Sequence, residues 1–256
     1  MRKCCAGIVG AVLAGLGLAA APATGQTVSQ VGSSADAMIL SSNPTLNYGA
    51  AGAISVSAPK ANGQLSSVIK FDLSSSKSLF DFTYGAGHWQ VQSATLQLFE
   101  ASPRSSVFNS PATAGSIAVT WQANDSWVEG TGSPINTATD GITWNTQPSF
   151  QSGSDASMGS LAYDGQTTAT PTYLLTLVGG FTSDVLAGGL TTLRLTAGDA
   201  NVNGVFNAKE FGTGSPNRPV LSVTAVPAAP APEPAGATLI IAAAAGWCGG
   251  RRRRRR

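Results

Sequence analysis

Between residues 26 and 226, apolar and polar residues alternate in short runs that Gly, Ser, Asn and Pro interrupt. Alternation with a period of two, enriched in β-branched and aromatic residues, is typical of β-strands. The clearest runs lie at 54–56, 67–71, 93–99, 117–121, 192–196 and 220–223. Residues 173–187 fit either a short helix or a strand, and no other window has a helical period. About eight to ten such strands predict one all-β domain, a single β-sandwich or jelly roll.

The N-terminus has the order of a secretory signal peptide. Met1-Arg2-Lys3 is positively charged, residues 6–21 are apolar, and Ala21-Pro22-Ala23 supplies the small residues that signal peptidase requires. The apolar stretch is short for a permanent membrane anchor. We therefore expect residues 1–25 to form a signal helix that is removed on export. The exported body, residues 26–226, contains no cysteine, so no disulfide can stabilise it.

The C-terminus carries a second targeting pattern. A Pro/Ala-rich linker begins at Pro227, an apolar stretch covers residues 235–250, and six arginines follow that would stay on the cytoplasmic side of a membrane. Pro-Glu-Pro, an apolar helix and an arginine cluster, in this order, resemble the PEP-CTERM sorting signal of Gram-negative bacteria. The resemblance implies transient insertion into the inner membrane, cleavage by an exosortase, and release to the cell surface or extracellular matrix. The residues of the signal are Pro232, Glu233, Pro234, Arg251, Arg252 and Arg253.

The formal net charge of +2 hides an acidic body. Eight of the fifteen Lys and Arg residues lie in 1–3 and 251–256, which leaves seven bases against all thirteen acids between residues 24 and 234, a net charge of −6. A nucleic-acid-binding protein needs a basic surface. The charge distribution therefore excludes nucleic acid as a partner.

Eight short segments of the body carry a family resemblance. They are Ala35-Asp36, 43–49, 71–73, 93–98, 127–130, 141–145, 208–210 and 218–221. In order and spacing they resemble a DNRLRE domain, which is related to disaggregatase and to the CBM96 carbohydrate-binding modules. The resemblance implies a jelly-roll-like sandwich, export and, in many members, polysaccharide binding. Ala208-Lys209-Glu210 departs from the Ser-Arg-Glu-like segment of the family but keeps a cation and the Glu.

Catalytic groups are scarce in the body. His88 is its single histidine, and residues 85–89 contain no nucleophile elbow. Asp125 and Glu129 form the closest pair of acids and could serve as glycosidase carboxylates, although a structural loop is the better interpretation. We therefore expect no enzyme activity.

Residues 199–210 match a calcium-binding pattern, D-x-N-x-N-G-x5-E. Its ligands would be Asp199, Asn201, Asn203, the Val205 carbonyl, Asn207 and Glu210. The flanking residues disagree with a calcium loop, because 190–197 alternates like a strand and 211–216 cannot begin a helix. A hairpin loop is the preferred interpretation, and calcium stays a possible cofactor.

Four tryptophans lie in the body, and flat aromatic faces can stack on sugar rings. Trp121 ends an alternating run and Trp144 belongs to a family-like segment, so both are predicted to be structural. Trp89 and Trp127 lie near loops and are the predicted ligand-binding residues, together with Glu129.

These observations predict a secreted, non-catalytic module that binds extracellular polysaccharide or helps to assemble a biofilm matrix. The first alternative is a purely structural surface protein, which predicts buried tryptophans. The second is a polysaccharide-degrading enzyme, which predicts two carboxylates that face each other across a groove. The acidic body would repel uronate-rich polymers.

Overall fold

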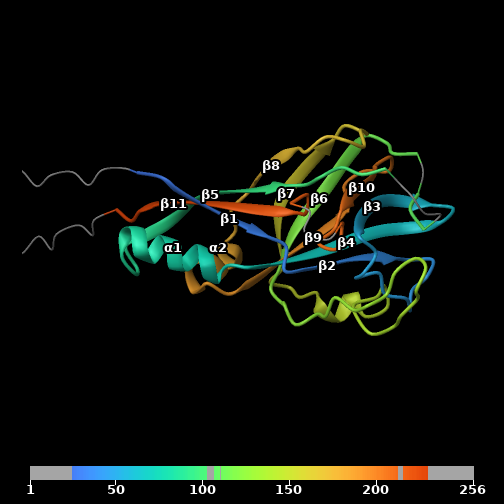
Figure 1. The fold of residues 1–256 in the computed structure, drawn as a ribbon, viewed down its shortest axis with the longest axis horizontal. Coiled ribbons are helices and arrows are strands. Elements are labelled where there is room, and N and C mark those ends of the chain that lie inside the picture. The colour runs from blue at the N-terminus through green and yellow to red at the C-terminus, as the bar shows by residue number, and fades with distance from the viewer. Residues whose placement is uncertain (1–24, 103–106, 110, 213–215, 230–256) are drawn as a thin grey trace, which may run out of the picture.

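The computed structural model describes residues 25–102, 107–109, 111–212 and 216–229. These residues form two β-sheets in which every pair of neighbouring strands is antiparallel (Figure 1). The fold is all-β, as the alternating pattern predicts. The expected signal helix, the C-terminal helix and the sorting residues lie outside the described residues. Within the described part, no helix has the length and apolar character needed to cross a membrane.

The smaller sheet contains four strands. Their order is β1 (Thr27–Gly32), β11 (Val220–Pro227), β5 (Trp89–Gln97) and β8 (Thr172–Leu175). Thr27 of β1 is opposite Ala225 of β11, so the first and last strands lie side by side (Figure 1). The chain therefore enters and leaves the body at the same end.

The larger sheet contains seven strands. Their order is β10 (Asn203–Asn207), β3 (Ala53–Lys60), β4 (Gly63–Asp72), β9 (Leu190–Ala197), β6 (Gly115–Gln122) and β7 (Ala156–Tyr163), and β2 (Ala35–Leu40) pairs with β4. The six predicted runs fall in β3, β4, β5, β6, β9 and β11, and these strands are confirmed.

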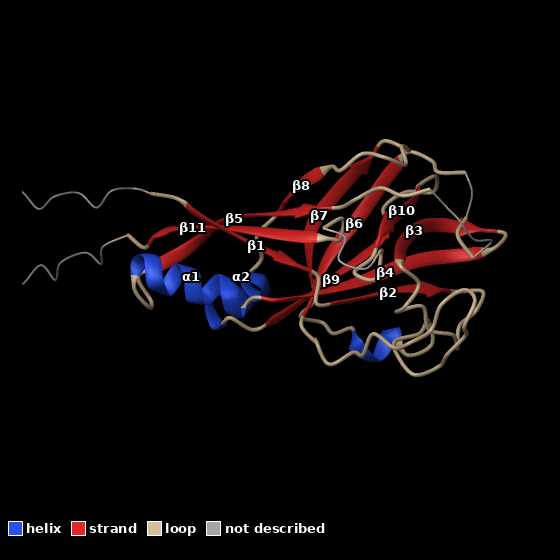
Figure 2. Ribbon diagram, viewed as in Figure 1, coloured by secondary structure: helices blue, strands red, loops and turns tan. Residues whose placement is uncertain are grey.

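Two α-helices, α1 (Ser74–Tyr84) and α2 (Gly179–Ala187), lie at one end of the body, and the short 3-10 helix η1 (Gln147–Phe150) lies in a long loop (Figure 2). The pattern of residues 173–187 left two alternatives open, and the segment contains both, because β8 ends before α2 begins. Helix α1 was not expected from its Ser-rich sequence. Its buried positions include Leu73 just before the helix and Phe80 two turns later, a spacing that fits a helical period.

The main hydrophobic core lies between the two sheets and is closed at one end by the helices. It includes Leu96 and Val223 of the smaller sheet, Ile69 and Leu193 of the larger sheet, Phe80 of α1 and Phe181 of α2, all 0% exposed. Burying a side chain of this size stabilises the fold by about 1.5–3 kcal/mol. A smaller cluster, in which Val68 packs with Trp127 and Ile142, forms on the opposite face of β2 and β4 beneath the loop that contains η1 (Figure 2).

Candidate functional site

Trp127 is a packing residue and not a surface residue. It is 1% exposed, and its Nε1 donates a hydrogen bond to Thr192 Oγ1 at 2.9 Å. The Lys70 ammonium lies 4.3 Å from the centre of the Trp127 ring and donates to the Trp127 carbonyl at 2.7 Å. No face of this indole is open to a sugar, so the prediction of Trp127 as a stacking residue is corrected.

Trp89 is also buried. It is 4% exposed, its ring centre lies 5.0 Å from that of Phe80, and its Nε1 donates to Asp81 Oδ1 at 2.8 Å. Trp121, which was expected to be structural, is 8% exposed and donates to Asp184 Oδ2 at 2.7 Å. The predicted stacking role of Trp89 is corrected for the same reason as that of Trp127.

The calcium-like segment 199–210 does not wrap around a common point. Asp199 caps its own turn, since its Oδ1 accepts from the backbone N–H groups of Asn201 and Val202 at 2.8 and 2.9 Å. Asn203 then begins strand β10, where its Nδ2 donates to the Asn109 and Pro111 carbonyls.

The rest of the segment continues as an extended strand. The Val205 carbonyl accepts from the Ala101 N–H at 2.8 Å, and Asn207 ends the strand beside a pocket. An extended strand rises about 3.3 Å per residue, so its side chains cannot converge on one ion. The predicted set from Asp199 to Glu210 is therefore not a twelve-residue calcium loop.

Glu210 instead joins Asp36 and Glu129 in what we call the acidic cluster. One carboxylate oxygen from each of the three residues lies within 4.8 Å of those of the other two. Asp36 comes from β2, Glu129 from the loop after β6, and Glu210 from the turn after β10. The Asp36 N–H donates to Glu129 Oε1 at 2.7 Å, which ties the loop to the strand.

Lys209 holds the acidic cluster together from one side. Its backbone N–H donates to Asp36 Oδ2 at 2.8 Å. Its ammonium lies 3.1 Å from Glu129 Oε2 and also pairs with Glu210 Oε1. Ser33 Oγ donates to Asp36 Oδ2 at 3.1 Å, whereas Asp36 Oδ1 is buried and has no hydrogen-bond partner among the described residues. Lys209 thus contacts all three carboxylates, but its ammonium pairs only with Glu129 and Glu210, and the hydrogen bonds to Asp36 come from uncharged donors.

The pKa values of the acidic cluster reflect its burial and its excess of negative charge. Burial raises the pKa of Asp36 to about 7, and the nearby carboxylates of Glu210 and Glu129 add to the rise. Burial also raises the pKa of Glu129. Burial lowers the pKa of Lys209, but its hydrogen bonds with Glu210 and Glu129 outweigh this effect, so the pKa is raised overall. Lys209 therefore stays cationic at neutral pH.

Asn47 fixes the loop that carries Glu129. Its Nδ2 donates to the carbonyls of Glu129 and Ile142 at 2.6 and 2.9 Å, and its Oδ1 accepts from the N–H groups of Gly49 and Gly132, both at 3.0 Å. A Cβ atom at Gly132 would overlap the Asn47 carbonyl, so the loop needs glycine there. Segments that carry the family resemblance meet around this amide and the acidic cluster.

Asp125 and Glu129 do not form an open catalytic pair. Both oxygens of Glu129 are engaged, by the Asp36 N–H and by Lys209. Asp125 Oδ1 is buried without a partner among the described residues, and burial raises the Asp125 pKa. The Lys70 ammonium interacts with both carboxylates and donates to the backbone between them.

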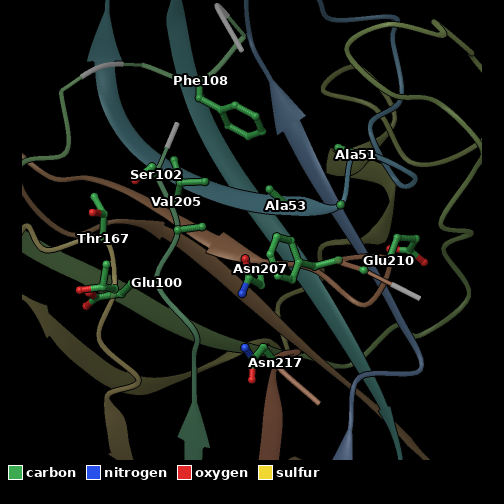
Figure 3. Close-up of a pocket in the computed structure, with 15 residues that line it drawn as sticks. Ala51, Ala53, Glu100, Ser102, Phe108, Thr167, Val205, Asn207, Glu210 and Asn217 are labelled. Atoms are coloured by element: carbon green, nitrogen blue, oxygen red, sulfur yellow. The ribbon is translucent and has the colours of Figure 1, made fainter. Parts of the chain in front are cut away.

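A pocket of about 490 Å³ opens beside the acidic cluster (Figure 3). Its lining comes from Ala51, Gly52, Ala53, Glu100, Ala101, Ser102, Phe108, Thr167, Thr168, Val205, Asn207, Glu210, Phe211, Gly212 and Asn217. Small-molecule sites in proteins usually measure about 300–1,000 Å³. The volume of this pocket therefore falls within the range of small-molecule sites.

The pocket combines aromatic and polar groups. Glu100 is 7% exposed, its Oε2 accepts from the Ala169 N–H at 3.1 Å, and burial raises its pKa. Asn207 is 5% exposed, and its Oδ1 has no hydrogen-bond partner among the described residues. In the view of Figure 3, Asn207 lies between Glu100 and Glu210, with the Phe108 ring above them.

Neither the acidic cluster nor the pocket is evident as a site from the sequence. Asp36 and Lys209 stood in segments that resemble a known family, which was the available signal for the acidic cluster. Glu100 had no such signal, because it follows β5 and its partners in the pocket come from strands and loops that are distant in the sequence.

Comparison of the sequence with models of known protein families and with curated proteins finds no match. The resemblance to a DNRLRE domain and the PEP-CTERM signal stay predictions. The geometry of the described residues is therefore the basis for the functional conclusion.

Proposed function

We propose that this chain is an exported, non-catalytic module that binds polysaccharide in the extracellular matrix of a Gram-negative-type bacterium. The proposal includes a jelly-roll-like β-sandwich of the DNRLRE type, removal of residues 1–25 by signal peptidase, and exosortase processing near Pro232, Glu233 and Pro234. It is supported by the order of targeting signals at the two ends of the sequence and by the two packed sheets of the body.

The observation that carries the binding function is the pocket beside the acidic cluster. Sugar recognition requires hydrogen-bond acceptors and donors for hydroxyl groups, together with an apolar surface for the C–H face of the ring. The pocket offers the Glu100 carboxylate, the Asn207 amide, the hydroxyls of Thr167 and Thr168, and the Phe108 ring. We therefore propose this pocket as the binding site, in place of Trp89 and Trp127.

We propose that the module has no catalytic activity, because its candidate catalytic groups are either held by other residues or lie away from the pocket. The Glu129 carboxylate is held by Lys209 and by the backbone N–H of Asp36, and the Glu129 carbonyl accepts the hydrogen bond from Asn47 that fixes the loop. Glu129 therefore lacks the freedom of a nucleophile or general acid. His88 is exposed on a turn after α1. Neither residue lines the pocket.

A purely structural surface protein is the second candidate. It is favoured by the burial of Trp89, Trp121 and Trp127, because tryptophans that fill a core have no face left for a ligand. The two candidates differ in whether the pocket binds anything.

The test is binding of the purified full-length chain to immobilised neutral and acidic polysaccharides. Thr168 is exposed at the pocket, so Thr168→Trp fills the pocket without disturbing the core. Thr139→Trp, at an exposed position outside the pocket, is the matched control. Binding that Thr168→Trp abolishes and Thr139→Trp preserves supports the proposal. Absence of binding to every polysaccharide, from a folded protein, leaves the structural role.

A further inference from the structure

The acidic cluster has the chemistry of a cation site. Asp36, Glu129 and Glu210 bring carboxylate oxygens from three separate segments to within 4.8 Å of one another. Calcium in proteins prefers carboxylate and carbonyl oxygens at about 2.3–2.6 Å, so two ligands on opposite sides of one ion lie about 4.6–5.2 Å apart. The spread of the three oxygens therefore fits a single calcium ion.

The charges of the cluster are not balanced by the protein. Lys209 supplies one ammonium, which is directed to Glu129 and Glu210, and the Lys70 ammonium interacts with Glu129 but is shared with Asp125. The contacts of Asp36 are the Lys209 backbone N–H and the Ser33 hydroxyl, which carry no net charge. A divalent cation would supply the charge that the cluster lacks.

A second, independent observation also points to a ligand. Asp36 is 0% exposed, and its Oδ1 has no hydrogen-bond partner anywhere in the described part of the chain. Most buried acceptors in folded proteins are satisfied, and an unsatisfied one costs free energy. Asp36 is one of the three residues whose carboxylates converge, so the residue that holds the free acceptor is itself a member of the cluster.

We propose that Asp36, Glu129 and Glu210 form a calcium-binding site in which Lys209 competes with the ion for two of the carboxylates. Glu210 is exposed and Glu129 is partly exposed, so water can reach the ion and complete its coordination. The site shares only Glu210 with the calcium pattern of residues 199–210, and it does not depend on whether the pocket binds sugar.

The experiment is calorimetric titration of the purified full-length chain with calcium chloride after treatment with chelator. We expect one ion per chain and a thermal midpoint that rises with calcium. Glu210→Gln keeps the size of the side chain at an exposed position and should weaken binding by about tenfold or more, because it removes a charged ligand. Lys209→Met should strengthen binding, because it removes the competing ammonium.

The control variant is Asp199→Asn, at the first position of the predicted calcium loop and outside the acidic cluster. It should bind calcium as the unchanged chain does. The proposal is overturned if calcium gives neither heat nor a thermal shift at about 10 mM, well above the range of weak extracellular sites. It is also overturned if Glu210→Gln binds as tightly as the unchanged chain, or if Asp199→Asn is the variant that loses the ion.

Discussion

Asp36→Asn is predicted to stabilise the protein at pH 8 in the presence of chelator. Asp36 is fully buried, and its folded pKa of about 7 lies far above the value of 3.8 for an unperturbed aspartate. The folded state therefore binds the Asp36 proton more tightly than the unfolded state does. In the asparagine variant, the amide oxygen can keep the hydrogen bonds from Ser33 and Lys209, and the amide nitrogen takes the place of the unpartnered Oδ1.

The size of the effect follows from the shift in pKa. Each unit of pKa corresponds to 1.36 kcal/mol, so the ionised carboxylate destabilises the fold by about 4 kcal/mol above pH 7. Below pH 3.8 both states are protonated and the penalty vanishes, and between these limits it grows as the pH rises. An amide accepts the two hydrogen bonds less strongly than a carboxylate, which subtracts about 1 kcal/mol from the gain. The variant should therefore be about 3 kcal/mol more stable at pH 8.

The assay is urea unfolding of both proteins at pH 4, 6 and 8, always with chelator. The charged groups that face Asp36 are Glu129, Glu210 and Lys209, and they are the same in both proteins, so the difference between the two unfolding free energies isolates Asp36. Asp140→Asn is the matched control, because Asp140 is exposed and hydrogen bonds from Thr131 lower its pKa. A stability difference for Asp36→Asn that does not grow between pH 4 and pH 8 would refute the reasoning.

Three further substitutions test the packing around the site and the core. Asn47→Ala removes four hydrogen bonds of the loop and should destabilise the protein by about 3–5 kcal/mol in urea unfolding, since three of their partners are backbone groups left buried. Gly180→Ala should lower the thermal midpoint by several degrees, because the new methyl group overlaps the Trp121 ring. Trp127→Phe should cost about 1–3 kcal/mol, because it leaves a cavity and removes the hydrogen bond to Thr192, and it should not change polysaccharide binding.

Much of the β-structure could be predicted because a strand with one buried face shows a local alternation of apolar and polar residues. In β4, Val68 packs under the outer loop and Ile69 packs into the main core, as the period of two requires. The sequence pattern of helix α1 was weaker, because one of its buried positions is occupied by Ser76, which forms a hydrogen bond with Ser29 of β1. An apolar residue at this position would have revealed the buried face of the helix.

The acidic cluster and the pocket could not be predicted, because they are assembled from distant segments. Asp36 and Glu129 are 93 residues apart, and nothing in the local pattern of either residue indicates the other. The burial of Trp127 could not be predicted for the same reason. Its position near a polar loop suggested a surface, but that loop covers the outer face of β2 and β4 and buries the indole against Val68.

The calcium pattern failed for a reason that applies to other β-proteins. Its ligand positions 1, 3, 5, 7 and 9 are alternate residues, which is also the spacing of one face of a strand. In β10, Asn203, Val205 and Asn207 share one face, whereas Phe206 on the other face enters the main core. The glycine at the sixth position does not distinguish the two structures either. A Cβ atom at Gly204 would meet the Phe206 ring at 3.1 Å, so close packing also favours glycine there. The flanking residues decide between a calcium loop and a strand, and the alternation of 190–197 correctly indicated a strand. The predicted hairpin is wrong, because β10 pairs with β3 and not with β9.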